Sequence, residues 1–148
     1  MLPAQQREQV VAYGKKLVET GLTEGTFGNL SVVNREQGLM AISPSGMDYF
    51  LTRPEDVAVV DLEGRQVDGG HKPSSEADLH RLVYLAREVV GGVVHTHSPF
   101  ATILSCLRWP IPPIHYLVAY SGREVPRIPS YSYGSLELAE TARDALAE

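Results

Sequence analysis

The sequence predicts one α/β domain in which helices flank a β-sheet. Amphipathic helical stripes alternate along the chain with short apolar runs of strand length, and turns rich in glycine and proline separate them. The length of 148 residues and the hydrophobic share of 43% suit one soluble domain with a sizeable core. No repeat or linker divides the chain, so we expect residues 1–148 to form a single domain.

Composition excludes some classes of binding partner and indicates the cellular compartment. The net charge of −5 gives no electrostatic footprint for nucleic acid. No apolar run approaches the roughly 20 residues of a membrane span, so we expect no membrane partner. The N-terminus is polar and unlike a signal peptide, and the single cysteine, Cys106, suits a reducing compartment. We therefore expect a cytoplasmic protein.

The first half of the chain predicts a helix followed by strands. Residues 4–20 carry an apolar stripe, and Gly21 suits the C-terminal cap of that helix. Apolar runs bounded by turn residues then predict short strands, of which the last two form a hairpin. The strands are expected at residues 30–33, 39–42, 57–62 and 65–67.

Two polar turns, Gly25–Ser31 and Ser43–Gly46, adjoin these strands. Glycine lets the backbone approach a ligand closely, and small polar side chains add donors for a phosphate. The same composition is ordinary turn chemistry, which each segment favours when it is taken alone.

A third polar segment, Lys72–Glu76, opens the next predicted helix. Ser75 and Asp78 fit a capping box, but a helix N-terminus also binds anions, and the pattern leaves both roles open for Ser75. Glu76 falls in the first turn, where a carboxylate complements the helix dipole. His80 lies one turn later and is expected to be a buried histidine rather than a metal ligand.

An apolar run then ends in two histidines, His95 and His97. If Val93–His97 is a strand, residues two apart point to the same side, and the two imidazoles lie side by side. Such a pair can bind zinc, and an open catalytic zinc needs about three protein ligands. From the spacing alone, two histidines without a metal are an equally good interpretation.

The last third predicts helices around an irregular middle. Pro99 is expected to begin one helix, and Ser135 is expected to cap a last helix that continues to the end of the sequence. Residues 125–131 are expected to be extended, whereas 114–118 fits either a strand or a helix.

Taken in order, these motifs resemble the class II aldolase/adducin family, and most of all its L-fuculose-1-phosphate aldolases. The resemblance covers nearly the whole chain and is more specific than any single motif. It implies a mainly antiparallel central β-sheet flanked by helices, and a homotetramer with the active site between subunits. The motifs are Gly25-Thr26-Phe27-Gly28-Asn29-Leu30-Ser31, Ile42-Ser43-Pro44-Ser45-Gly46, Lys72-Pro73-Ser74-Ser75-Glu76, Val94-His95-Thr96-His97-Ser98 and Ile114-His115-Tyr116.

The resemblance also implies a role for individual residues. His95 and His97 would bind one Zn²⁺, or another divalent ion, and Glu76 would be both a ligand and the catalytic acid/base. Tyr116 from a neighbouring subunit would donate a proton at the aldehyde oxygen. The phosphate of a sugar substrate would be held by Gly28, Asn29, Ser45, Gly46, Ser74 and Ser75.

The implied reaction cleaves a ketose 1-phosphate, such as L-fuculose 1-phosphate, to dihydroxyacetone phosphate and an aldehyde. Zinc suits it because cleavage leaves a carbanion next to a carbonyl, and a Lewis acid stabilises that charge. Two alternatives remain: a methylthioribulose-1-phosphate dehydratase of the same family, and a non-catalytic adducin-like interaction domain. A pentulose-5-phosphate 4-epimerase is disfavoured because its pattern has aspartate where this chain has Glu76.

One departure from the family pattern is expected. The family takes a third zinc histidine from a segment beyond the region that matches Ser135–Glu148. We expect this chain to lack that C-terminal segment, since the sequence stops before it. His71, His80 and His115 do not match the position of the third ligand. The expected metal shell is therefore Glu76, His95 and His97.

Overall fold

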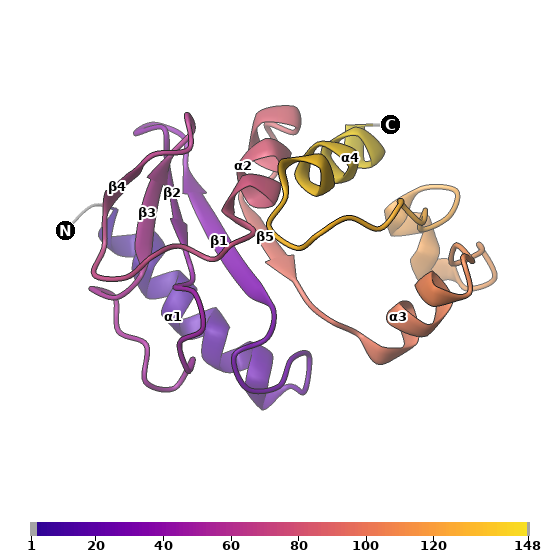
Figure 1. Cartoon of the computed structure of the whole chain (residues 1–148), viewed down its shortest axis with the longest axis horizontal. Helices are drawn as coiled ribbons and strands as arrows, with labels where there is room; N and C mark the ends of the chain where they lie inside the picture. The colour runs from indigo at the N-terminus through magenta and orange to yellow at the C-terminus, as the bar shows by residue number, and fades with distance from the viewer. Residues whose placement is uncertain (1–2, 148) are drawn as a thin grey trace.

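The computed structural model describes residues 3–147 and confirms an α/β fold. One sheet of five strands has the order β4-β3-β2-β1-β5, and every neighbouring pair is antiparallel (Figure 1). The strands are β1 (Asn29–Asn34), β2 (Leu39–Ile42), β3 (Ala58–Asp61), β4 (Gln66–Asp68) and β5 (Gly92–His95). The helices are α1 (Ala4–Glu19), α2 (Ala77–Ala86), α3 (Pro99–Cys106) and α4 (Leu136–Ala147), with a 3-10 helix η1 (Tyr116–Ser121).

Helix α1 covers one face of the sheet, as its apolar stripe predicts. Val10 and Leu17 are buried in a cluster with Leu30 of β1 and Ala41 of β2. The predicted cap at Gly21 is confirmed: this residue has φ 70°, and its N–H donates to the carbonyl of Val18 at 3.0 Å. A left-handed glycine with this bond closes the last turn of the helix.

Helix α2 covers the opposite face of the sheet. Its Tyr84 is fully buried with Met40 and Ile42 of β2, among other apolar side chains. The guanidinium of Arg35 donates to the carbonyls of Tyr84, Arg87 and Val90, which satisfies backbone groups that the end of the helix leaves without intrahelical partners. Strand β1 therefore has α1 on one side and α2 on the other.

The chain beyond β5 leaves the sheet and then returns to it. Helix α3 begins at Pro99, as predicted, but buries none of its residues. Of the segment 114–118, predicted as strand or helix, only residues 116–118 are helical, within η1. The predicted extended segment contains one isolated bridge, between Ile111 and Val125. Helix α4 then lies beside α2 (Figure 1), and the Ser135 hydroxyl accepts the N–H of Leu138 at 3.2 Å, which confirms the predicted cap.

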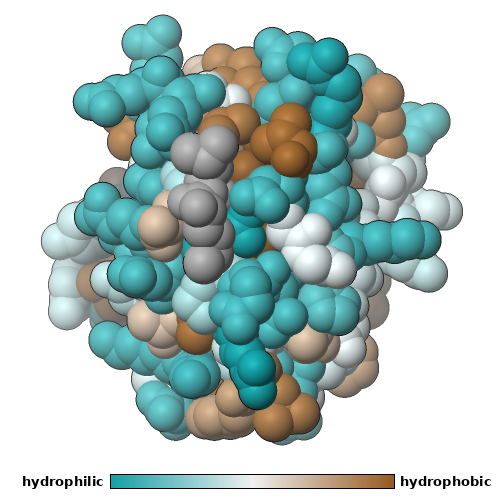
Figure 2. Space-filling view, turned by 90° about the vertical axis from the view of Figure 1, so that its left-hand side faces the viewer, coloured by the Kyte–Doolittle hydropathy of each residue, from teal (hydrophilic) through white to brown (hydrophobic). Residues whose placement is uncertain are grey.

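We call residues 99–121 the arm, because Figure 1 shows them to one side of the sheet. The arm exposes large apolar side chains, among them Phe100, Ile103, Trp109, Ile114, Leu117 and Tyr120. By contrast, the face at the β4 edge is mostly hydrophilic (Figure 2). Among the described residues, no helix is long and apolar enough to cross a membrane.

Candidate active site

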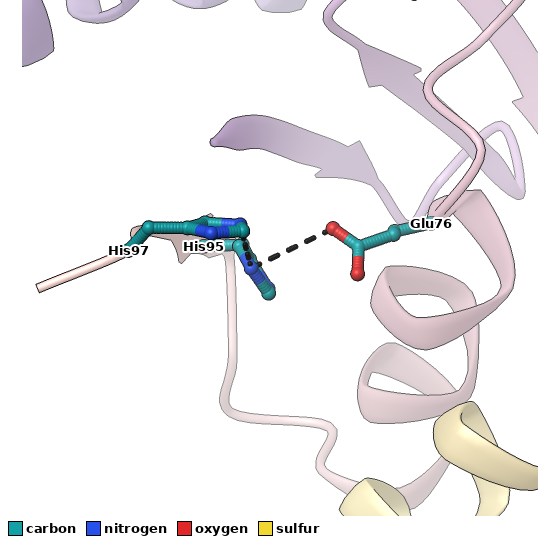
Figure 3. Close-up of side chains that lie close together, drawn as sticks. All are labelled: Glu76, His95 and His97. Atoms are coloured by element: carbon teal, nitrogen blue, oxygen red, sulfur yellow. Dashed lines mark hydrogen bonds and ion pairs between the residues drawn. The ribbon is translucent and has the colours of Figure 1, made fainter. Parts of the chain in front are cut away.

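Three side chains from distant parts of the sequence meet beyond the end of β5. Nε2 of His95 lies 3.0 Å from Nε2 of His97 and 3.6 Å from Oε2 of Glu76 (Figure 3). One potential ligand atom from each residue lies within 4.8 Å of the others. Within residues 3–147 this is the group of side chains that could hold a metal ion, and its two imidazoles and one carboxylate are ligands that zinc accepts.

The histidines converge in a different way from the one predicted. Strand β5 ends at His95, so the expected strand through His97 is too long. The chain has to leave the sheet before Pro99, which begins α3. His95 pairs with Asn29 across β1 and β5 and therefore shares the face that α2 covers, which directs it toward Glu76.

Glu76 is the N-cap residue of α2, and the predicted capping box is wrong. The helix begins at Ala77, which places Ser75 one position too early to cap it. The hydroxyl of Ser74 accepts the N–H of Glu76 at 3.3 Å instead, while Asp78 pairs with Arg81. This turn points the Glu76 side chain toward the two histidines and leaves it 9% exposed.

The electrostatics of the site favour imidazoles that can bind a metal. Burial lowers the pKa of His95, and the neighbouring His97 lowers it further, although the Glu76 carboxylate opposes them. A lowered pKa keeps His95 neutral, and neutral imidazole is the form that binds a metal ion. The donors present thus fit a divalent cation.

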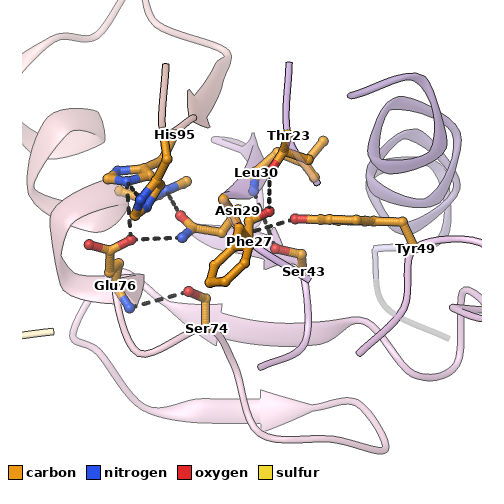
Figure 4. Close-up of polar contacts among 12 residues, drawn as sticks. Thr23, Phe27, Asn29, Leu30, Ser43, Tyr49, Ser74, Glu76 and His95 are labelled. Carbon is orange, nitrogen blue, oxygen red and sulfur yellow. Dashed lines mark hydrogen bonds and ion pairs between the residues drawn. The ribbon is translucent and has the colours of Figure 1, made fainter. Parts of the chain in front are cut away.

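Buried polar side chains stand behind Glu76. Its Oε2 accepts a hydrogen bond of 2.8 Å from Nδ2 of Asn29 (Figure 4). Oδ1 of Asn29 in turn lies 2.6 Å from Nε2 of His80. His80 is completely buried, and burial lowers its pKa to about 3. The prediction that His80 is a buried histidine is therefore confirmed.

The three predicted phosphate-binding loops lie next to one another. Leu30 and Ser43 exchange two hydrogen bonds, of 3.2 and 3.0 Å, and the N–H of Ser74 donates to the carbonyl of Ser43 at 3.0 Å. The Tyr49 hydroxyl donates to the carbonyl of Gly28 at 3.0 Å and so fixes the first loop (Figure 4). Among the predicted phosphate contacts, Ser45, Gly46 and Ser75 are exposed, Gly28 is half-buried, and Asn29 and Ser74 are buried.

Tyr116 is not brought to this site by its own chain. It is 76% exposed on η1, in the arm (Figure 1). Its predicted catalytic role depends on a second subunit and stays a prediction.

Four residues that support the site were given no individual role from the sequence. Ser43 and Tyr49 hold the first loop, while Ser31 and Tyr84 extend the hydrogen-bond chain behind His80. Part of this could be found from spacing. Glu76, His80 and Tyr84 are four residues apart on a helix, and Asn29 and Ser31 are two apart on a strand, so each set shares a face.

Comparison with known proteins identifies the family. The family model described as "Class II Aldolase and Adducin N-terminal domain" matches residues 8–148. The chain belongs to the class II aldolase/adducin family. The expected resemblance is thereby confirmed.

Individual members of the class II aldolase/adducin family are also similar to the chain. A 5-deoxy-D-ribulose 1-phosphate aldolase of Bacillus thuringiensis is 47% identical over 148 residues, which are 100% of this chain and 70% of the relative. A 5-methylthioribulose-1-phosphate/5-deoxyribulose-1-phosphate aldolase of Rhodospirillum rubrum is 42% identical over 141 residues, which are 95% of this chain and 62% of the relative. The chain thus spans about two thirds of the length of these relatives.

A solved class II aldolase structure confirms the fold. An L-fuculose 1-phosphate aldolase superposes with a TM-score of 0.93 and 44% sequence identity, over 99% of this chain and 69% of the other. The antiparallel sheet flanked by helices is therefore the family fold. These relatives are metal-dependent lyases that act on sugar phosphates.

Proposed function

We propose that this protein is a zinc-dependent aldolase that cleaves a ketose 1-phosphate to dihydroxyacetone phosphate and an aldehyde. The observation that carries the proposal is the meeting of Glu76, His95 and His97 beside three hydrogen-bonded polar loops. A purely structural group of histidines would not require three polar loops beside it. We place the enzyme in the cytoplasm, which suits its single cysteine.

Each residue of the cluster has a distinct part in the proposal. Glu76, His95 and His97 would hold the divalent cation, which supplies Lewis-acid polarisation of the substrate carbonyl. The Glu76 carboxylate would move the proton at the substrate carbon next to that carbonyl. Protons compete little with the cation for the imidazole of His95, because burial has lowered the pKa of this residue.

The loops position the substrate through its phosphate. In this proposal Gly28, Asn29, Ser45, Gly46, Ser74 and Ser75 bind the phosphate oxygens through N–H groups and hydroxyls. Gly28 and Gly46 have φ of 70° and 66°, a conformation that glycine adopts without strain. One N–H of the Asn29 side-chain amide bonds to Glu76, and the second N–H of the same group is the donor that we assign to the phosphate.

A pocket beside His97 has room for the rest of the sugar. It has a volume of about 490 Å³, and its lining includes Leu22, Phe27, Pro99 and Phe100. These apolar side chains suit an aldehyde that ends in a methyl group, and Thr23, Glu24, Thr96 and Ser98 add polar groups to the same lining. Both 5-deoxyribulose 1-phosphate and L-fuculose 1-phosphate yield such an aldehyde, and the similar aldolases are named for these two sugars.

The proposed active form is a homotetramer in which a neighbour completes the site. Two features support it: Tyr116 is 76% exposed, and the arm that carries it presents apolar side chains such as Ile114, 88% exposed. Contact with a neighbouring copy would bury these side chains and place Tyr116 next to the metal-binding side chains of that copy. In that position its phenol donates the proton at the aldehyde oxygen.

The test is the release of dihydroxyacetone phosphate from 5-deoxyribulose 1-phosphate and L-fuculose 1-phosphate by the zinc-loaded protein. We expect Glu76→Gln to lower kcat at least about 100-fold, since general acid–base catalysis contributes roughly that much or more. Glu88→Gln, which changes an exposed carboxylate, is the matched control and should retain full turnover. Full turnover by Glu76→Gln would refute the role of Glu76.

Product analysis and metal content separate the alternatives. A product that has lost water but kept its carbon skeleton would identify the dehydratase of the same family. An inactive wild type that binds no divalent metal would identify the adducin-like interaction domain, which the exposed apolar arm favours.

A further inference from the structure

Five buried side chains form one continuous hydrogen-bond chain that ends on Glu76. The hydroxyl oxygen of Tyr84 lies 2.7 Å from Oγ of Ser31, and that Oγ lies 2.7 Å from Nδ1 of His80. Nε2 of His80 lies 2.6 Å from Oδ1 of Asn29, and Nδ2 of Asn29 lies 2.8 Å from Oε2 of Glu76. No member is more than 9% exposed, so water does not compete for these contacts.

The chemistry of the groups gives this chain one direction. The Glu76 carboxylate accepts, so the Asn29 amide presents its NH₂ group to it and its oxygen to His80. His80 therefore carries its proton on Nε2. Its pKa of about 3 keeps it neutral at pH 7, so Nδ1 accepts the single hydroxyl proton of Ser31.

The end of the hydrogen-bond chain at Tyr84 is consistent with the same donor-to-acceptor direction. Since Ser31 has used its proton on His80, the Tyr84 hydroxyl is the donor between these two residues. The same single proton also faces the backbone carbonyl of Ser31 at 2.9 Å, so Tyr84 shares it between the two oxygens of Ser31. From Ser31 to Glu76, each proton of the hydrogen-bond chain has one place.

The opposite tautomer of His80 would disrupt the hydrogen bonds at the Glu76 end of the hydrogen-bond chain. A proton on Nδ1 leaves Nε2 as an acceptor, and the Asn29 amide would then have to flip to donate to it. The flipped amide would present its oxygen to the Glu76 carboxylate, which is repulsive. The tautomer of His80 therefore decides whether Glu76 receives a hydrogen bond or a repulsion from Asn29.

We propose that His80 is a positioning residue that, through Asn29, fixes the orientation of the Glu76 carboxylate toward His95 and His97. The consequence for metal binding rests on the proposed function. The oxygen that Asn29 holds, Oε2, is the one that faces Nε2 of His95 at 3.6 Å. Partners of this kind, which orient a ligand without touching the metal, typically change metal affinity 10–100-fold when they are mutated.

The test compares three full-length variants by Zn²⁺ affinity in competition with a chelator. His80→Phe removes the donor to Asn29, and we expect zinc affinity to fall about 10–100-fold. His80→Gln keeps an amide N–H that reaches Asn29, and we expect affinity within about threefold of wild type. Tyr84→Phe cuts the far end of the chain and leaves His80 in place, so it should lower the melting temperature without changing zinc affinity by more than about threefold.

A second readout needs no metal. Nitrogen-15 NMR of the metal-free wild type should show His80 as the neutral Nε2–H tautomer and a slowly exchanging Asn29 side-chain amide. The Nδ1–H tautomer would overturn the proposal, and so would a folded His80→Phe variant that binds zinc as wild type does. Equal losses of zinc affinity in His80→Phe and Tyr84→Phe would also overturn it, because they would indicate a general effect of stability. If wild type binds no zinc but shows the expected tautomer, the metal-dependent function fails while the orientation by His80 stands.

Discussion

Replacing Gly28 by alanine tests whether the first polar loop and the metal ligands form one unit. Gly28 has φ of 70°, and a Cβ built on it would lie 2.7 Å from the backbone oxygen of His95. Gly25, in the same loop, has φ of 57° and no heavy atom within 4 Å of such a Cβ. Gly25→Ala is therefore a matched control for the backbone conformation alone.

The structure gives a magnitude for each change. A non-glycine residue in the left-handed region costs roughly 1–2 kcal/mol, and we expect that loss of unfolding free energy for Gly25→Ala. Gly28→Ala has the same cost and must also push the end of β5 away, and overpacking of this kind adds about 1–3 kcal/mol. We therefore expect about 2–5 kcal/mol for Gly28→Ala.

Urea unfolding of the metal-free proteins measures these losses, and chelator competition measures the effect on the ligand His95. Because the contact is with the backbone of His95 itself, zinc affinity should fall at least about tenfold in Gly28→Ala and stay unchanged in Gly25→Ala. If the two variants are equally stable and bind zinc equally well, the loop and β5 are not coupled and the reasoning is refuted.

Two further predictions concern the metal and the buried histidine. Chelation should abolish aldol cleavage, and added Zn²⁺ or another divalent ion should restore it; cleavage that survives complete removal of the metal would contradict the proposed role of His95 and His97. The pKa of His80 is about 3 in the folded protein and near 6.5 when unfolded, so the unfolded state binds the extra proton between these values and stability is lost as pH falls from 6.5 toward 3. Between pH 6.5 and 4.5 the wild type should lose about 2 kcal/mol more unfolding free energy than His80→Gln in urea titrations, and equal losses would contradict the burial of a neutral His80.

Local patterns predict most of the framework, because short-range physics decides those elements. The stripe of α1 and its cap at Gly21 need only the neighbouring turns, and Ser135 caps α4 with its own hydroxyl. The ends of elements at the site are different. A strand through His97 and a cap at Ser75 are both plausible locally, but the turn before Pro99 and the Ser74 hydroxyl decide otherwise.

The candidate site could be predicted as a set of residues but not as a network. Family likeness groups Glu76 with the histidines, and the structure brings them together. The links through Asn29 and His80 depend on which face of β1 meets which face of α2, and the sequence does not state that register. The position of Tyr116 relative to the site could not be predicted either, because the site that it would complete belongs to a second copy of the chain.

The placement of this network in the core has a consequence for how the protein can vary. Strand β1 is covered on both faces, and its face toward α2 carries Asn29 and Ser31. Apolar residues at these positions would need no hydrogen-bond partners. Buried polar groups are costly unless every partner is present, so a change at His80 disturbs folding and the site together. The arm is less constrained, because most of its side chains are exposed and Val118 is the buried exception among those described. Variation in the arm can therefore alter assembly and the presentation of Tyr116 without disturbing the cluster of Glu76, His95 and His97.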